Sequence, residues 1–207
     1  MFDCKALTGS SWGAALAVAL TMAGTGPALA EVPRTQPDQA LQQLAKKLEP
    51  YKNVAYARSQ GYVQGSACDS HPTLGAMGYH YVRPDLLGMT APVNGRMNGT
   101  GTYTGVEPPA ILLYAPDGQG GLELVGIELL VFGAAWEAAN NHPPMYRGRE
   151  YNYMADDPNT ARDEAHGFMP HYDLHIWLYE HNPSGLYAQW NPSVSCGGVG
   201  HFRHVEE

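Results

Sequence analysis

Residues 171–181, HYDLHIWLYEH, decide both the expected fold and the expected site. In a β-strand, successive side chains point to opposite faces of the sheet. One face then carries a hydrophobic stripe suited to a core, formed by Tyr172, Leu174, Ile176 and Leu178. The other face carries His171, Asp173, His175, Trp177, Tyr179 and His181. Three imidazoles and a carboxylate on one face indicate a transition-metal site or a proton-transfer site.

The same segment as a helix would place His171 and His175 side by side, four residues apart. Its β-branched and aromatic residues, and the HNPSG turn at 181–185, favour a strand instead. In a strand these two histidines are about 13 Å apart. They cannot then bind one ion without a bend between them.

Two further candidates lie on other predicted strands. His80, in GYHYV, points away from the flanking Tyr79 and Tyr81. Glu128 is the one charged residue in LVGIELLVF, and a buried carboxylate is costly unless it is paired or metal-bound. The alternatives are a core histidine bonded to a backbone carbonyl and, for Glu128, an ion pair with Arg83 or a solvent-facing edge position.

The most economical metal site combines His80, Glu128 and His175, with Asp173 as a ligand or as a hydrogen-bond partner of one. His171 is a further candidate ligand, because it lies about 7 Å from Asp173 on the same face. Imidazole and carboxylate ligands suit zinc or copper. Without a metal, Glu128 or Asp173 beside a histidine would be the catalytic residue of acid–base chemistry.

Other residues have weaker claims to a role. Trp177 and Tyr179 continue the site face and are predicted to line a ligand pocket, although core aromatics need no ligand. His71 is a secondary candidate because it follows Cys68. No role is expected for the remaining histidines, which are His142, His166, His181, His201 and His204.

The rest of the chain predicts an α+β fold with two N-terminal helices on a mainly antiparallel sheet. Helices are expected over 35–49, where Thr35 and Asp38 have capping-box-like spacing, and over 51–60. Strands are expected over 76–82, 111–115, 122–132, 171–180 and 186–190, with hairpins at PDGQGG and HNPSG. The long irregular segments 88–109 and 133–170 are predicted to be binding loops or disorder, and the aromatic content of the second favours an ordered cover over the sheet. The tail after 196 is predicted to be frayed.

The N-terminus has the pattern of a secretory signal peptide over 1–30, with a cut after Ala30. Residues 31–207 then form a single exported domain, periplasmic or secreted, with no membrane span. A retained N-terminal anchor is the alternative.

Only Cys68 and Cys196 follow the signal peptide, so an oxidising compartment predicts a disulfide between them. Two thiolate metal ligands are the alternative, which no clustered spacing supports. The net charge is −8 and no basic cluster occurs, which argues against nucleic acid and anionic lipid as partners. The expected partner is a metal ion or a small polar ligand.

Three segments, AMGYHYVRPDLL, PAILLYAPDGQGGLELVGIELLV and MPHYDLHIWLYEHNPSGLYAQWNPSVSC, resemble a family of small uncharacterised exported bacterial proteins. The GYHYV and HYDLHIWLYEHNPSG motifs carry the resemblance, which covers roughly residues 40–196. It implies export and a shared domain, and it transfers no catalytic residue. Segment 88–109 is longer than the family's pattern.

Three hypotheses follow for the function. The first is an exported metal-binding protein, which as an enzyme would act on a small polar substrate. The second is a non-enzymatic periplasmic ligand-binding module with an aromatic-lined pocket. The third is metal-free acid–base catalysis. The first requires the imidazoles and Glu128 to converge, and the second requires the histidines to be dispersed around an aromatic groove.

Overall fold

The computed structural model describes residues 38–197. The fold is α+β and its main sheet is antiparallel, as predicted. The predicted signal peptide and most of the predicted tail lie outside the described residues.

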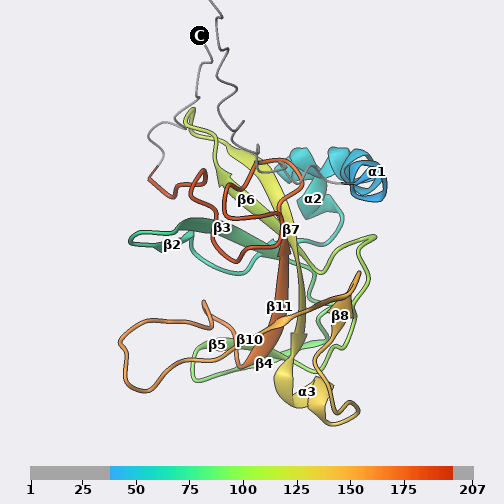
Figure 1. The fold of residues 1–207 in the computed structure, drawn as a ribbon, viewed down its shortest axis with the longest axis vertical. Coiled ribbons are helices and arrows are strands. Elements are labelled where there is room, and N and C mark those ends of the chain that lie inside the picture. The colour runs from blue at the N-terminus through green and yellow to red at the C-terminus, as the bar shows by residue number, and fades with distance from the viewer. Residues whose placement is uncertain (1–37, 198–207) are drawn as a thin grey trace, which may run out of the picture. The chain divides into compact units, whose positions relative to one another are not determined.

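The main sheet has seven strands in the order β1-β3-β6-β7-β11-β10, with β2 also paired to β3. The strands are β1 (Val63–Gln64), β2 (Asp69–His71), β3 (Gly75–Val82), β6 (Ile111–Pro116), β7 (Leu122–Phe132), β10 (Asn152–Met154) and β11 (His171–Ile176). Figure 1 shows the long strand β7 and the strand β11 side by side in the middle of this sheet.

Helices cover one face of the sheet. They are α1 (Gln39–Leu48) and α2 (Val54–Ser59), joined by the 3₁₀ turn η1 (Glu49–Lys52). The first predicted helix is therefore confirmed over 39–48, and its N-cap is Asp38, whose side chain accepts from the Leu41 N–H at 3.1 Å. The second is shorter than predicted, because Pro50 starts a 3₁₀ turn and Asn53 begins α2 afresh as its N-cap.

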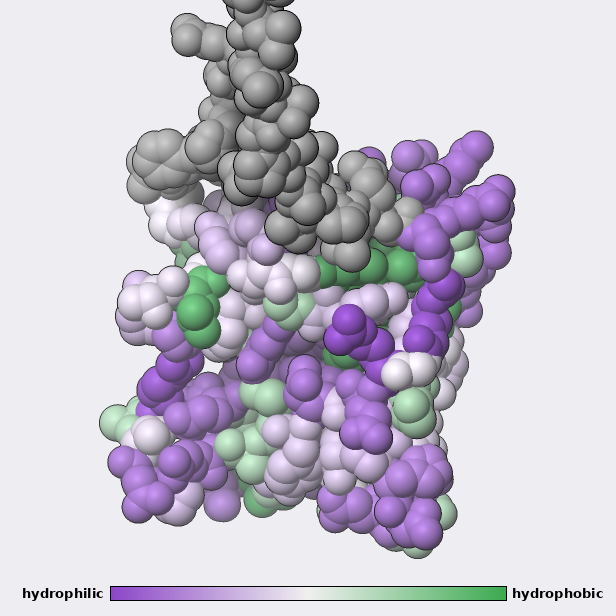
Figure 2. Space-filling model, in the orientation of Figure 1, coloured by the Kyte–Doolittle hydropathy of each residue, from purple (hydrophilic) through white to green (hydrophobic). Residues whose placement is uncertain are grey.

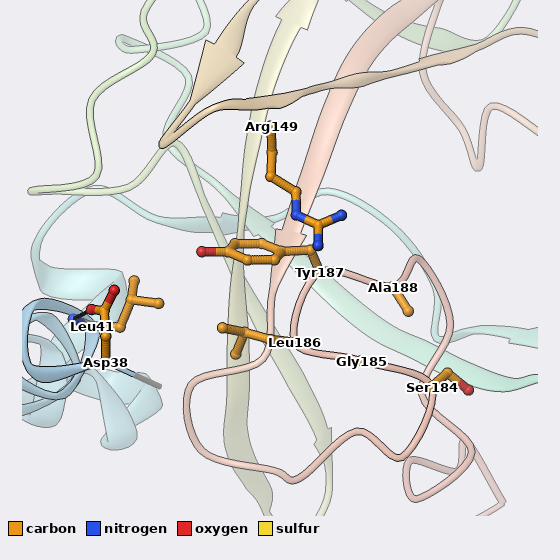
Figure 3. A pocket seen from close by; sticks show the side chains of 8 residues that line it. All are labelled: Asp38, Leu41, Arg149, Ser184, Gly185, Leu186, Tyr187 and Ala188. Atoms are coloured by element: carbon orange, nitrogen blue, oxygen red, sulfur yellow. Dashed lines mark hydrogen bonds between the residues drawn. The ribbon is translucent and has the colours of Figure 1, made fainter. Parts of the chain in front are cut away.

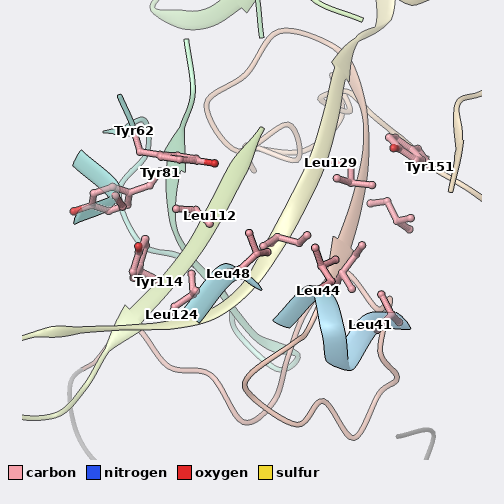
Figure 4. Close-up of a cluster of buried hydrophobic side chains, with 14 residues drawn as sticks. Leu41, Leu44, Leu48, Tyr62, Tyr81, Leu112, Tyr114, Leu124, Leu129 and Tyr151 are labelled. Atoms are coloured by element: carbon pink, nitrogen blue, oxygen red, sulfur yellow. The ribbon is translucent and has the colours of Figure 1, made fainter. Parts of the chain in front are cut away.

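The sheet separates two hydrophobic clusters. The leucines of α1 pack on Leu112, Leu124 and Leu129 of the strands, as Figure 4 shows. The opposite face carries a second cluster, which includes Leu113, Leu130, Phe132, Phe168 and Trp177. Loops, rather than helices, cover this second face, and the candidate site lies there.

A β-bulge between β6 and β7 changes one predicted face. Leu113 pairs with Gly126, but Tyr114 pairs with Leu124, so Val125 is the extra residue. Val125 therefore packs with the second cluster, while Ile127 packs with the first. Strict alternation along LVGIELLVF would put Val125 on the same face as Ile127, and the bulge moves Val125 to the other face.

The predicted second hairpin does not form. β11 ends at Ile176, and residues 186–190 are not a strand. Trp177 N–H still donates to Leu186 O, as it would in a hairpin. Bonds from side chains to backbone carbonyls take the place of the other backbone bonds of the predicted hairpin. Trp177 Nε1 donates to Ala188 O, and Asn182 Nδ2 donates to Trp190 O. These side-chain bonds hold the segment as an irregular loop.

The segments expected to be irregular contain short elements. Segment 88–109 includes the hairpin of β4 (Met89–Val93) and β5 (Arg96–Gly99). Segment 133–170 includes α3 (Gly133–Glu137), the hairpin of β8 (Met145–Tyr146) and β9 (Arg149–Glu150), and β10. Both segments are therefore ordered covers of the structure rather than disordered loops.

The chain after β11 is tied back to β2 and β3. Cys68 and Cys196 form the predicted disulfide, with a Cα–Cα distance of 5.6 Å. Asn191 and Ala76 exchange backbone hydrogen bonds of 3.1 Å. Gly75 permits this contact, because a Cβ there would lie 2.0 Å from Asn191 O.

The surface seen in Figure 2 is mostly hydrophilic or neutral, and hydrophobic residues occupy small separate areas. The exposed large hydrophobic residues are scattered along the described chain: Tyr56, Val63, Leu74, Val93, Met145 and Tyr153. Within residues 38–197, no helix is long and apolar enough to cross a membrane.

Candidate metal centre

Strand register brings the predicted site residues together on the face opposite the helices. His175 of β11 lies directly across from Glu128 of β7. Asp173 and His171 follow at two-residue intervals along β11, as the alternation of a strand requires. His80 projects from β3, beyond the intervening strand β6. Glu128 and His80 therefore approach each other across one strand.

A sixth residue, His166, comes from the segment between β10 and β11. Its backbone is in the left-handed region at φ 38°, and the next residue is Gly167 at φ 88°. Backbone bonds from Met97 N–H to Gly167 O and from Met169 N–H to Met97 O attach this segment to β5. His166 lies in a turn, as predicted, but the structure brings its ring into the cluster, where no role was expected for it. No periodicity marks it in the sequence, because it lies in a turn.

The donor atoms of these six residues form two overlapping sets. The four-residue set contains Glu128, His166, His171 and Asp173, and the three-residue set contains His80, Glu128 and His175. Within each set, all ligand atoms lie within 4.8 Å of one another. Two ligands of one ion, each about 2.0–2.2 Å away from it, are at most about 4.4 Å apart. The span of each set is slightly wider than this limit, so small shifts of the side chains would close each set around an ion.

Individual distances agree with shared coordination. His80 Nε2 lies 3.1 Å from Glu128 Oε2, and His175 Nε2 lies 3.9 Å from the same oxygen. His166 Nε2 is 3.9 Å from both Glu128 Oε1 and Asp173 Oδ2. His171 Nε2 is also 3.9 Å from Asp173 Oδ2.

The cluster is fully enclosed, and its polar atoms are not satisfied by hydrogen bonds. The side chains of His80, Glu128, His171, Asp173 and His175 are 0% exposed, and that of His166 is 1% exposed. Nine buried nitrogen and oxygen atoms of these six side chains have no hydrogen-bond partner. Leaving so many polar atoms unpaired in a core is expensive, whereas an ion among them would satisfy them together.

Hydrogen bonds at the other ring nitrogen orient three of the imidazoles. His171 Nδ1 donates to Met169 O at 3.0 Å, and His166 Nδ1 donates to Glu164 O at 3.3 Å. Both acceptors are carbonyls, so Nδ1 carries the hydrogen and Nε2 faces the cluster. This is how proteins orient metal-binding histidines.

His80 is held in the same way by Ser66. Ser66 Oγ lies 2.7 Å from Ala67 O and 2.9 Å from His80 Nδ1. When the hydroxyl donates to Ala67 O, it accepts from Nδ1, and in that tautomer the lone pair of Nε2 faces Glu128 Oε2. Two lone pairs 3.1 Å apart repel each other unless a proton or a cation lies between them.

Burial and the mutual charges shift the pKa values strongly. Burial raises the pKa of Glu128, but His80, His166 and His175 outweigh it and hold that pKa well below its usual range. Burial, together with the nearby Glu128, raises the pKa of Asp173 to about 8. Burial lowers the pKa of His171 and of His175 to about 3.

His166 behaves differently from its neighbours. Burial lowers its pKa, but the carboxylates of Glu128, Asp173 and Asp69 outweigh this and raise the pKa to about 9. At neutral pH, therefore, His171 and His175 are neutral, and His166 and Asp173 hold protons. A binding ion displaces such protons, so its affinity falls as the pH falls.

Some candidate residues lie outside the cluster. His71 Nδ1 accepts from the Thr73 and Leu74 N–H groups in a turn. Arg83 forms its ion pair with Asp85, not with Glu128. Cys68 and Cys196 are joined to each other, so they are not thiolate ligands.

The two predicted pocket aromatics lie in different places. Trp177 is 2% exposed and its ring stacks on His175, with 6.0 Å between ring centroids. Tyr179 lies with the helix-side cluster, where its hydroxyl donates to Ala45 O at 2.6 Å. Neither residue lines the two pockets described next.

A pocket of about 300 Å³ reaches the cluster from outside. Ser66, Asp69, Met97 and His166 are among its lining residues. Asp69 Oδ2 is buried there without a hydrogen-bond partner, and burial raises the pKa of Asp69. The pocket therefore borders the cluster at His166.

A second pocket, of about 390 Å³, lies away from the cluster. Figure 3 shows it between Asp38 of the α1 N-cap, Arg149 and the loop 184–188. Arg149 lies over the Tyr187 ring, 5.1 Å from its centroid. Tyr187 is the one aromatic residue in its lining, so this pocket is not an aromatic-walled groove.

The buried imidazoles and carboxylates could hold a metal ion without thiolates. Comparisons with protein-family models, with curated proteins and with solved structures return no match for the chain.

Proposed function

We propose that this protein is an exported metal-binding protein that holds a first-row transition metal in the buried cluster of four histidines and two carboxylates. The observation that carries the proposal is that six buried side chains, with nine atoms lacking a hydrogen-bond partner, place their ligand atoms in two compact, overlapping sets. Zinc and copper are the leading candidates, because imidazole and carboxylate suit both ions.

The charges in the core support a bound cation. Glu128 and Asp173 are both fully buried, and among the described residues no lysine or arginine forms an ion pair with either. Buried carboxylates are retained when they are paired or coordinate a metal. The basic side chains within 4 Å of them are histidines, which suits a metal centre better than a structural salt bridge.

Export is part of the same proposal. The disulfide between Cys68 and Cys196 requires an oxidising compartment to persist. The N-terminal pattern over 1–30 is typical of a secretory signal peptide, and the periplasm is the simplest destination. The ion would then be acquired outside the cytoplasm, through the pocket that reaches His166.

The first test is the metal content of the protein, purified without chelators or a histidine tag. Wild-type protein is expected to retain zinc or copper at one equivalent or more. Glu128→Gln should lose it, because Glu128 belongs to both sets and a neutral amide is a poor ligand. We expect a drop in affinity of more than about 100-fold, beyond the loss caused by removing an outer hydrogen-bond partner.

His142→Ala is the matched control, because His142 is exposed and lies outside both sets. It should retain the wild-type metal content. If wild-type protein stays without metal even after incubation with zinc and copper, the proposal is wrong.

Ser66→Ala should weaken metal binding while leaving every ligand in place. Ser66 accepts the hydrogen bond from His80 Nδ1, and loss of such a partner typically costs about 10–100-fold in affinity. Competition with a chromophoric chelator measures the change. Ser59→Ala removes a comparable hydroxyl on exposed α2 and should have no effect. Equal affinities of both variants would show that Ser66 does not orient His80.

A further inference from the structure

The two carboxylate oxygens of Glu128 face different histidines. Oε2 lies near Nε2 of His80 and of His175, at 3.1 and 3.9 Å. Oε1 lies 3.9 Å from His166 Nε2. Glu128 is the one residue common to the three-residue set and the four-residue set. Its carboxylate therefore lies between two groups of ligands rather than at the centre of one.

A single ion does not account for all six side chains. Its ligands must lie within about 4.4 Å of one another, and the six donors divide into two sets rather than one. One ion in the four-residue set would leave His80 and His175 unpartnered in the core. One ion in the three-residue set would leave His166 and His171 without a partner in the core.

We infer that the cluster binds two metal ions bridged by the Glu128 carboxylate, with His80 and His175 on one ion and His166, His171 and Asp173 on the other. This inference rests on the proposed function and extends it. In known two-metal sites the ions are about 3.5–4 Å apart, a separation that one bridging carboxylate can span. The anionic bridge also offsets the repulsion between two cations in a core.

The two ions have unlike coordination. The four-residue set supplies four ligands, which complete a tetrahedron and make a closed, structural type of site. The three-residue set supplies three ligands, which leaves a position for water or for a small ligand. The second ion is therefore the one that can do chemistry.

Residues associated with each of the two proposed ions line the same pocket. His166 of the four-residue set lines it directly. Ser66, which holds His80 of the three-residue set, lines it as well. A ligand for the open position therefore has to be small enough to pass from this pocket of about 300 Å³ into an enclosed core.

Metal stoichiometry and magnetic coupling test the pair. Zinc-loaded wild-type protein should contain two ions per chain after extensive dialysis. His175→Ala and His171→Ala should each retain one, since each removes a ligand of one ion alone, and His142→Ala should retain two. Copper(II)-loaded wild-type protein should show the electron paramagnetic resonance of a coupled pair, whereas His175→Ala and His171→Ala, with one ion each, should show the signal of an isolated ion.

The outcomes separate this inference from the proposed function. Two zinc ions and a coupled copper signal support the bridged pair. One ion in wild-type protein, lost in both histidine variants, overturns the pair and leaves a mononuclear centre. No bound metal overturns both. Wild-type stoichiometry and the copper signal decide the matter even if a variant fails to fold.

Discussion

Replacing both cysteines, as Cys68→Ala with Cys196→Ala, is expected to lower the free energy of unfolding by about 5 kcal/mol. The disulfide closes a loop across 128 residues of sequence, so it removes much of the conformational freedom of the unfolded chain. Urea unfolding followed by circular dichroism measures the loss. Such a loss is a large part of the total stability of an ordinary domain.

Wild-type protein in a strong reductant is the control, and it should unfold at the same urea concentration as the double variant. A loss below about 1 kcal/mol would contradict the expectation. In that case the backbone bonds between Asn191 and Ala76 would be enough to hold the C-terminal segment in place.

Metal binding should stabilise the folded protein by about 4 kcal/mol when free zinc is present at about 1,000 times its dissociation constant. The reason is that the ligands come from distant parts of the sequence, His80 to His175, and converge only in the folded chain. For a domain of this size, the melting temperature should rise by about 8–16 °C. Differential scanning calorimetry, with and without a chelator, measures the shift.

Glu128→Gln is the matched comparison, because it keeps the volume of the side chain and removes the charge shared by the two sets. Its melting temperature should not respond to zinc. An equal rise in this variant would mean that zinc stabilises the protein from another site, and it would contradict the buried centre.

The longest strands could be predicted from the sequence because their evidence is local. β7 begins and ends at the predicted residues, and β3 and β6 each differ by one residue at one end. The two- and three-residue strands β1, β2, β8, β9 and β10 could not be predicted, since such strands exist only through pairing with distant partners. The end of β11 was missed for a related reason. The Trp177 side chain donates a hydrogen bond to Ala188 O, and the residues around Trp177 in the sequence do not predict that contact.

The residues of the site also differ in whether local sequence predicts them. Five of its residues were recognised because alternation along a strand places a polar side chain on a face, and the structure brings these five together. The cluster has two sets of ligands because the spacing along β11 separates His171 from His175. His175 groups with His80, and His171 groups with Asp173. His166 depends on a turn with a positive φ, and a tertiary contact with β5 places it. Ser66 and Asp69 were missed for the same reason.

The segment that carries His166 gives the buried centre a link with the surface. Its exposed acidic residues Asp156 and Asp163 both bind Arg96, and its backbone bonds to Met97 on the same strand. The other five ligands belong to strands of the sheet, so an ion that gains or loses His166 changes the constraint on this one external segment. If the cluster binds metal as proposed, ligation by His166 would therefore change how firmly this exposed segment is held against β5.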